Sequence, residues 1–96
     1  HIDQGARKAL IDRQSSLLSP GISEVVGVFE RGEVLSICDS DAHQIACGIS
    51  NYSSSDLTKI AGMKSEQFEK VLDINFGDEI VHRNNMVILT EAENGI

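Results

Sequence analysis

The sequence has no tryptophan, one tyrosine and one proline among its 96 residues, so its core has to be built mainly from aliphatic side chains. Its two cysteines are too few for a disulfide scaffold, which indicates a reducing setting. No apolar run approaches the roughly 20 residues that a membrane-spanning helix needs. No basic segment followed by an apolar one marks a signal peptide. We therefore expect a cytoplasmic protein with no membrane partner.

Basic residues are also scarce: eight Lys and Arg stand against fifteen Asp and Glu, which gives a net charge of -7. Binding of nucleic acid without sequence preference depends on cations that neutralise phosphates. The net charge therefore opposes RNA binding unless the basic residues gather on one face. Arg7, Lys8 and Arg13 do cluster near the N-terminus, but the solvated face of a helix explains this cluster equally well.

The length of 96 residues and the hydrophobic fraction of 41% fit one globular domain with a modest core. The chain opens at His1-Ile2-Asp3 without an initiator methionine. This opening predicts a fragment of a longer protein, or a processed product.

Local patterns predict a helix followed by three strands in the first half of the chain. Apolar residues recur at helical spacing in residues 5–13, and Asp3 precedes them as a candidate N-cap. Residues 25–29 and 34–38 are β-branched runs on either side of a polar break that contains a glycine, which predicts a β-hairpin. Residues 44–49 follow as a third strand with small side chains.

Two short helices are predicted next. Ser53 and Asp56 have the spacing of a capping box, and Gly62 stands where a glycine ends a helix. A second helix is expected to begin at Ser65. Its apolar face would consist of Phe68, Val71 and Leu72.

Two final strands are predicted at residues 79–82 and 86–89. The order of elements contains no βαβ repeat, so a parallel nucleotide-binding sheet is not indicated. The predicted fold class is mainly β with short α-helices (α+β), in which five or six short strands close into a partial barrel and helices cover its edges. The domain would span residues 1–90, with a polar C-terminal tail at 91–96.

The sequence offers little that could carry chemistry of its own. It has neither of the glycine-rich motifs that cradle phosphates. Cys38, His43 and Cys47 flank one turn, but a zinc site needs a fourth ligand and their spacing matches no usual knuckle. Cys47 with His43 or His82 would suit a nucleophile and base only if the thiol were reactive, and two buried, inert strand thiols are the simpler expectation. We predict no catalytic, cofactor-binding or metal-binding residue.

The least ordinary segment is Val81-His82-Arg83-Asn84-Asn85-Met86, which sets polar residues between two apolar strand ends. One interpretation is a hairpin whose asparagines adopt positive φ. The alternative is that His82 and Arg83 form a contact surface for a neighbouring domain, a subunit or an RNA phosphate.

Six fragments of the sequence, in order and spacing, resemble the PUA domain that ends many bacterial glutamate 5-kinases. They are Asp3-Gln4-Gly5-Ala6 with Ala9-Leu10, residues 16–22, residues 27–34, residues 45–48 with 51–54, residues 60–62 and residues 81–86. The sequence departs from the family pattern at three places. Cys47 stands where arginine is usual, Asn84 where aspartate is usual, and Asp73-Ile74 where Gly-Tyr is common.

The resemblance implies a PUA-like pseudo-barrel and an accessory, regulatory role. The parent enzyme would transfer the γ-phosphate of ATP to the side-chain carboxylate of L-glutamate, the first step of proline biosynthesis. ATP and Mg²⁺ would bind an upstream amino-acid-kinase domain of the same polypeptide, so no such residue is carried over to this chain. The resemblance also implies a homo-oligomeric parent.

PUA domains of modification enzymes bind RNA through the first helix and the final strand. In this sequence those elements hold Arg7, Lys8, His82 and Arg83, which are the candidate RNA or interdomain contact residues. The leading hypothesis is thus an accessory domain of a kinase, and the second is an RNA-binding module. A third hypothesis, an autonomous small enzyme, has the least support from the sequence.

Overall fold

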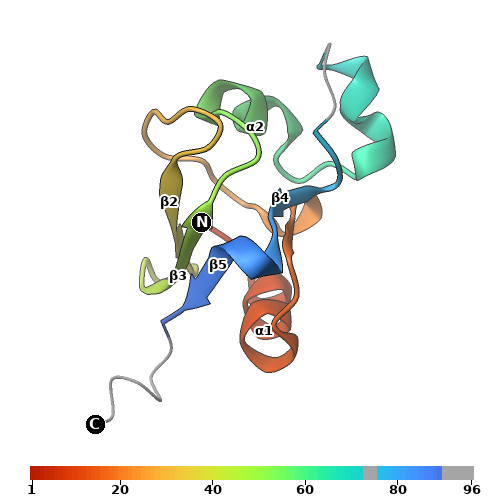
Figure 1. The fold of residues 1–96 in the computed structure, drawn as a ribbon. Helices are drawn as coiled ribbons and strands as arrows, with labels where there is room; N and C mark the ends of the chain where they lie inside the picture. Colours follow the sequence, from red (N-terminus) through yellow and green to blue (C-terminus); the bar gives the residue numbers. More distant parts are fainter. Residues whose placement is uncertain (73–75, 90–96) are drawn as a thin grey trace, which may run out of the picture.

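The computed structural model describes residues 1–72 and 76–89 (Figure 1). It contains the helices α1 (Gln4–Arg13) and α2 (Ser54–Ile60), the 3₁₀ turns η1 (Ser19–Gly21), η2 (Ser65–Lys70) and η3 (Arg83–Asn85), and the strands β1 (Leu17–Leu18), β2 (Val34–Cys38), β3 (Gln44–Ile49), β4 (Glu79–Val81) and β5 (Met86–Ile88). None of the helices in these two ranges has the length and apolar character needed to cross a membrane. The residues Asp73-Ile74 and the predicted tail at 91–96 lie outside the described residues.

The five strands form two antiparallel sheets. One sheet has the order β2-β3-β5, and the other pairs β1 with β4. Helices α1 and α2 lie at opposite ends of this arrangement (Figure 1). The predicted fold class, mainly β with short helices, is confirmed.

The predicted helix ends are confirmed by their capping contacts. Asp3 accepts a hydrogen bond from the Ala6 N–H at 2.8 Å, which satisfies one of the free donors at the start of α1. Ser53 accepts from the Asp56 N–H at the start of α2. Gly62 adopts φ +83°, the left-handed conformation expected just after the helix.

The second predicted helix is shorter and more tightly wound than the sequence suggested. Residues 65–70 form a 3₁₀ turn, and Lys64 precedes it without a side-chain cap, so the expected Ser65 cap is wrong. Phe68 and Leu72 are buried as predicted. Val71 is exposed, because it lies just after the 3₁₀ turn with φ -123° and ψ -16°, so the helical spacing that would align it with Phe68 is not kept.

The predicted hairpin between residues 25–29 and 34–38 is wrong. β2 pairs instead with β3, and the connection between them is the short turn after Cys38. Residues 25–29 form no strand, and Gly27 adopts φ +83°, which interrupts an extended run. Phe29 is held by Ser54, whose hydroxyl accepts the Phe29 N–H at 3.0 Å and whose own N–H donates to the Phe29 carbonyl at 2.9 Å.

The hairpin expected around residues 81–86 is also wrong. β4 pairs with β1 and β5 pairs with β3, so the two strands belong to different sheets and η3 carries the chain between them. The asparagines do not adopt positive φ. Instead, His82 caps η3 through its Nδ1, which accepts the Asn84 N–H at 3.1 Å.

The core is aliphatic, as the composition predicts, with Tyr52 and Phe68 as its two fully buried rings. The Tyr52 hydroxyl donates to the Gly77 carbonyl at 2.6 Å and accepts the Phe76 N–H at 3.0 Å. These bonds satisfy the one polar group that the ring brings into the core. The Ser19 hydroxyl donates to the Met63 carbonyl and so ties η1 to the segment after α2.

Candidate functional site

Arg7 and Lys8, the first half of the predicted contact surface, lie side by side on α1. The Arg7 side chain is turned toward the β2–β3 turn, where its Nε lies 3.4 Å from Oδ2 of Asp39. Lys8 is exposed. Of these two cations, therefore, Arg7 already has an internal acidic neighbour, and Lys8 faces solvent.

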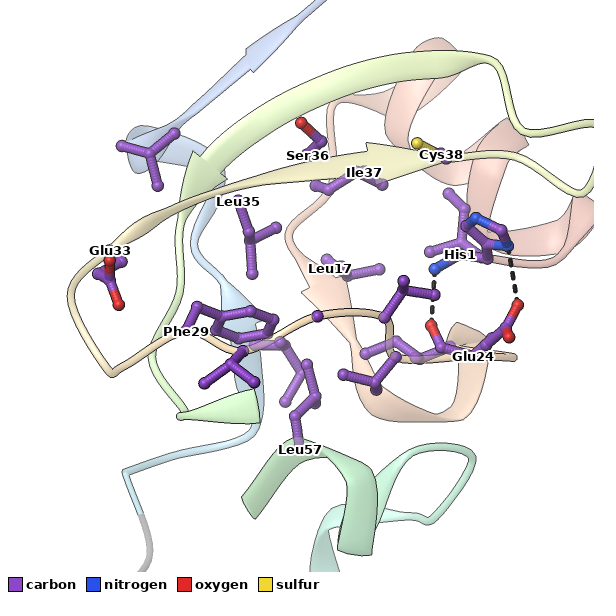
Figure 2. A pocket seen from close by; sticks show the side chains of 18 residues that line it. His1, Leu17, Glu24, Phe29, Glu33, Leu35, Ser36, Ile37, Cys38 and Leu57 are labelled. Atoms are coloured by element: carbon purple, nitrogen blue, oxygen red, sulfur yellow. Dashed lines mark hydrogen bonds and ion pairs between the residues drawn. The ribbon is translucent and has the colours of Figure 1, made fainter. Parts of the chain in front are cut away.

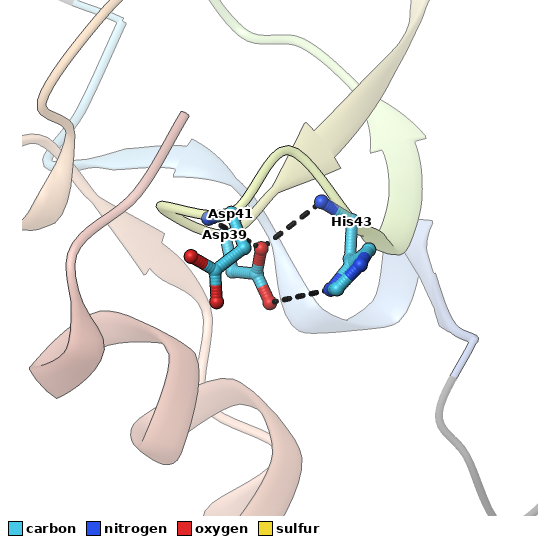
Figure 3. A group of neighbouring side chains, drawn as sticks. All are labelled: Asp39, Asp41 and His43. Carbon is cyan, nitrogen blue, oxygen red and sulfur yellow. Dashed lines mark hydrogen bonds and ion pairs between the residues drawn. The ribbon is translucent and has the colours of Figure 1, made fainter.

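Asp39 organises the turn that receives Arg7. Its Oδ1 accepts the backbone N–H groups of His43 and Asp41, each at 3.0 Å (Figure 3). The Asp39 side chain is almost fully buried. These bonds hold the pKa of the Asp39 carboxyl below its usual value. The bond from the His43 N–H has the largest effect, and the bond from Asp41 with the charges of His43 and Arg7 adds to it against the opposing effect of burial.

The ligand atoms of Asp39, Asp41 and His43 lie within 4.8 Å of one another, a spacing that suits a metal ion (Figure 3). However, both oxygens of Asp39 are already engaged: Oδ1 with backbone N–H groups, and Oδ2 with Arg7 and with His43 Nδ1 at 3.8 Å. The cluster is therefore explained by closure of the turn. This cluster shares only His43 with the possible zinc ligands Cys38, His43 and Cys47 discussed from the sequence.

Replacing Asp39 with asparagine should lower stability at neutral pH and reduce the loss of stability in acid. Because the folded pKa is depressed, the carboxylate contributes stability above its ordinary pKa of 3.8, and this stability is lost as the pH falls through the lower folded pKa. The measurement is urea unfolding of both proteins between pH 7 and pH 2. Asp41→Asn, an exposed change in the same turn, is the control. If the difference in stability between Asp39→Asn and the unchanged protein were the same at every pH, it would contradict a lowered pKa for Asp39 in the folded state.

His82 and Arg83, the second half of the predicted surface, lie at the start of η3. His82 is half-buried and is occupied on both sides, by the Asn84 N–H at Nδ1 and by Glu79 Oε1 at 3.7 Å from Nε2. Arg83 is exposed, and within residues 1–72 and 76–89 it forms no ion pair. Its backbone N–H donates to the Ser16 hydroxyl at 2.9 Å, which fixes η3 beside the segment that follows α1.

The structure therefore brings the four predicted residues together only in part. The Ser16–Arg83 bond places η3 near the C-terminal end of α1, whereas Arg7 and Lys8 lie in its first half. The two exposed cations, Lys8 and Arg83, are the members that a partner can reach. The ion pair between Asp39 and Arg7 was missed, because the two residues are distant in sequence. An aspartate in a turn commonly accepts hydrogen bonds from nearby backbone N–H groups, as Asp39 does.

The prediction that both cysteines are buried is wrong, because the structure leaves Cys38 and Cys47 half-buried. Cys47 stands opposite Ser36 and Val87, two exposed residues, so its side chain lies on the outer face of the sheet. No hydrogen bond joins Cys47 to His43 or His82 in the described part of the chain; His43 lies beside Asp39, and His82 caps η3.

A second candidate feature is an apolar groove of about 450 Å³ along β2 (Figure 2). Its floor is made of Leu17, Leu35, Ile37, Leu57 and Ile80, and residues 24–29 form the wall that faces β2. Sequence reasoning missed this groove, because it had paired the two walls directly as a hairpin.

The comparisons with known proteins decide the family. A family model described as the PUA domain matches residues 1–72. The chain belongs to the PUA domain family. It is 44% identical over 90 residues to a glutamate 5-kinase of Vibrio vulnificus, covering 94% of this chain and 24% of that protein. It is 49% identical over 88 residues to a glutamate 5-kinase of Shewanella pealeana, covering 92% of this chain and 24% of that protein.

The PUA chain thus spans about a quarter of the length of the curated relatives it matches, and it is homologous to their C-terminal PUA domain. A solved PUA domain from Aeropyrum pernix K1, a tartrate complex, superposes with a TM-score of 0.61 at 23% identity. The match covers 84% of this chain and 39% of that one. This likeness supports the fold alone.

Proposed function

We propose that this PUA domain is an accessory, regulatory domain of a longer glutamate 5-kinase, and that it acts through contacts rather than through chemistry of its own. One observation carries the proposal. The chain is 42–49% identical over more than nine-tenths of its length to proteins named glutamate 5-kinase, yet it corresponds to only about a quarter of each.

In this proposal the rest of the polypeptide supplies the catalytic chemistry. An upstream amino-acid-kinase domain binds ATP, Mg²⁺ and L-glutamate and transfers the γ-phosphate to the glutamate side chain, which begins proline biosynthesis in the cytoplasm. The parent is a homo-oligomer. The polar groups described here fit this division, because the Asp39–Arg7 and His82–Glu79 pairs hold the domain's own turns in place.

Deleting residues 1–96 from the whole polypeptide should leave phosphoryl transfer to glutamate in place and change either the oligomeric state or the feedback response. The oligomeric state is measured by light scattering. The feedback response is measured as kinase activity across a series of concentrations of proline, the end product. Two double variants locate the contact. Lys8→Glu with Arg83→Glu should reproduce the change caused by the deletion, and the control, Lys59→Glu with Lys70→Glu on another exposed surface, should not. A deletion protein that matches the whole polypeptide in activity, feedback and assembly would overturn the proposal.

RNA binding is the alternative function, and it has weaker support. The exposed cations of the predicted surface are Lys8 and Arg83, since Arg7 faces Asp39 and His82 faces Glu79. Each phosphate that a protein neutralises on a duplex contributes about -0.9 to the slope of log affinity against log salt concentration. Two cations would thus give a slope of only about -2, on a domain whose net charge of -7 repels RNA.

A further inference from the structure

The sheet β2-β3-β5 carries apolar residues on both of its faces. Its inner face packs on the core through Leu35, Ile37, Ala46, Met86 and Ile88. On its outer face the strand register places Val34 opposite Ile49, and Cys47 opposite Val87. An antiparallel sheet with one face in water normally alternates apolar and polar residues, whereas strands that are buried on both faces are apolar throughout. The composition of this sheet is therefore that of a sheet covered on both sides.

The residues Val34, Cys47, Ile49 and Val87 define the outer sheet face. Val34 is 69% exposed, Val87 59% and Ile49 40%, and Cys47 between them is half-buried. Along these described strands, no outward position carries a charged side chain. The neighbouring Ser36 hydroxyl accepts a hydrogen bond from Gln44 Nε2 at 3.2 Å. A contiguous exposed surface that is apolar and uncharged is typical of an interaction site.

The small size of the outer sheet face limits the kind of partner that can cover it. A stable complex between separate proteins buries about 800 Å² and roughly 20–30 residues on each side, far more than these side chains supply. A domain that is tethered to the sheet is held at an effective concentration in the millimolar range, about the value for a short linker, so a small contact is enough. The size of the face therefore favours a domain of the same polypeptide.

The relatives supply such a domain and the direction from which it comes. The chain corresponds to 24% of each of two glutamate 5-kinases, at their C-terminal end, so most of the polypeptide lies upstream. The Ile2 N–H donates to the Cys38 carbonyl at 2.8 Å, which places His1 at the end of β2. Figure 2 shows His1 beside Cys38 at this end of the strand. The upstream part is thus attached at the edge of the sheet whose outer face is uncovered.

We propose that the upstream kinase domain of the longer polypeptide packs against the outer sheet face. The proposal rests on the proposed function, because it needs that domain. The surface that meets the sheet is apolar and uncharged, since a charged group brought against this face would lose its water without gaining a partner. This contact differs in kind from the one at Lys8 and Arg83, which is made by exposed cations.

Cys47 gives a direct test, because its thiol lies in the middle of the outer sheet face, between Ser36 and Val87. The measurement is the rate at which iodoacetamide alkylates Cys47 in the whole polypeptide, folded and unfolded in urea, followed by mass spectrometry of the peptide. A covered thiol should react at least about 100-fold more slowly in the folded polypeptide, because reaction requires the domains to separate. Folded and unfolded rates within about ten-fold of each other would overturn the inference.

The variant Ile49→Glu with Val87→Glu should raise the alkylation rate of Cys47 in the folded polypeptide about ten-fold or more, because two carboxylates oppose burial against an apolar surface. Nearby carboxylates raise the pKa of a thiol and so slow its reaction, which means that a faster rate reports uncovering. Val71→Glu is the matched control, since Val71 lies outside the sheet and is 40% exposed, as Ile49 is. It should leave the rate unchanged. An unchanged rate in the double variant would overturn the inference.

Cross-linking identifies what covers the face. A photoreactive benzophenone amino acid in place of Val87 is activated in an equal mixture of isotope-labelled and unlabelled whole polypeptide. We expect links to residues upstream of His1 within one isotopic form. Links that join the two forms would identify a second copy as the occupant and would overturn the inference. Neither readout depends on glutamate phosphorylation, so a polypeptide that is no glutamate kinase can still show the covered face, and a regulated kinase can fail to show it.

Discussion

Replacing Tyr52 with alanine is expected to lower the free energy of unfolding by about 4 kcal/mol, the largest effect of any single truncation in this PUA domain. The ring is fully buried. It packs edge-on against Phe68 at 5.9 Å between centroids and at a tilt against Phe76 at 5.6 Å. Alanine would leave a cavity at this junction and two backbone groups without their partner.

Tyr52→Phe separates the ring from its hydroxyl. Phenylalanine keeps the packing but leaves the Gly77 carbonyl and the Phe76 N–H without the hydroxyl, so we expect a loss of about 1–2 kcal/mol. Urea unfolding of the three proteins, followed by circular dichroism, measures both steps. Equal losses for Tyr52→Phe and Tyr52→Ala would contradict the view that the ring contributes most of the stability.

Replacing Gly48 with alanine is expected to cost about 3 kcal/mol, although it adds a single methyl group. A Cβ at this position would lie 2.6 Å from Val81 Cγ1, 2.8 Å from the Asn85 carbonyl oxygen and 3.2 Å from Met86 Cα. Two of these three atoms are backbone, so they cannot rotate out of the way. The contact lies where the chain passes from β4 through η3 to β5, which is where the two sheets meet.

Gly5→Ala is the matched control for Gly48→Ala. Gly5 lies in α1, and a Cβ there would meet only Asp3 Oδ1 at 3.5 Å, an ordinary contact. Alanine should stabilise the helix by up to about 1 kcal/mol, because it has the higher helix propensity. Opposite signs in the midpoints of urea unfolding are therefore expected for the same chemical change. A Gly48→Ala protein as stable as the unchanged one would show that the sheets can separate at this point.

The parts of the fold that could be predicted are those fixed by local chemistry. Asp3, Ser53 and Gly62 mark helix ends because their capping partners lie within a few residues, and all three do so in the structure. β2 and β3 were also located correctly, since β-branched residues favour extended backbone.

Strand pairing could not be predicted in the same way, because it depends on residues far apart in the sequence. The valines of residues 25–29 are equally suited to a strand and to one wall of an apolar groove, and only the absence of a neighbouring partner separates the two. The connection at Arg83-Asn84-Asn85 reads as a hairpin turn. It leads to another sheet because Gly48 lets η3 approach β3 closely.

The candidate contact surface was predicted in composition but not in detail. Lys8 and Arg83 are exposed as a contact surface requires. Arg7 pairs with Asp39, and His82 pairs with Glu79. No local sequence pattern predicts the first pair, because Asp39 is 32 positions from Arg7. Long-range ion pairs of this kind decide which cations remain available to a partner.

The most direct test of the account is the rate of phosphoryl transfer from ATP to L-glutamate by three proteins: the whole polypeptide, the polypeptide without residues 1–96, and residues 1–96 alone. We expect turnover by the first two, with different assembly or feedback, and none above the blank by the third. Turnover by residues 1–96 alone would contradict the account, because it would place the catalytic centre inside this domain.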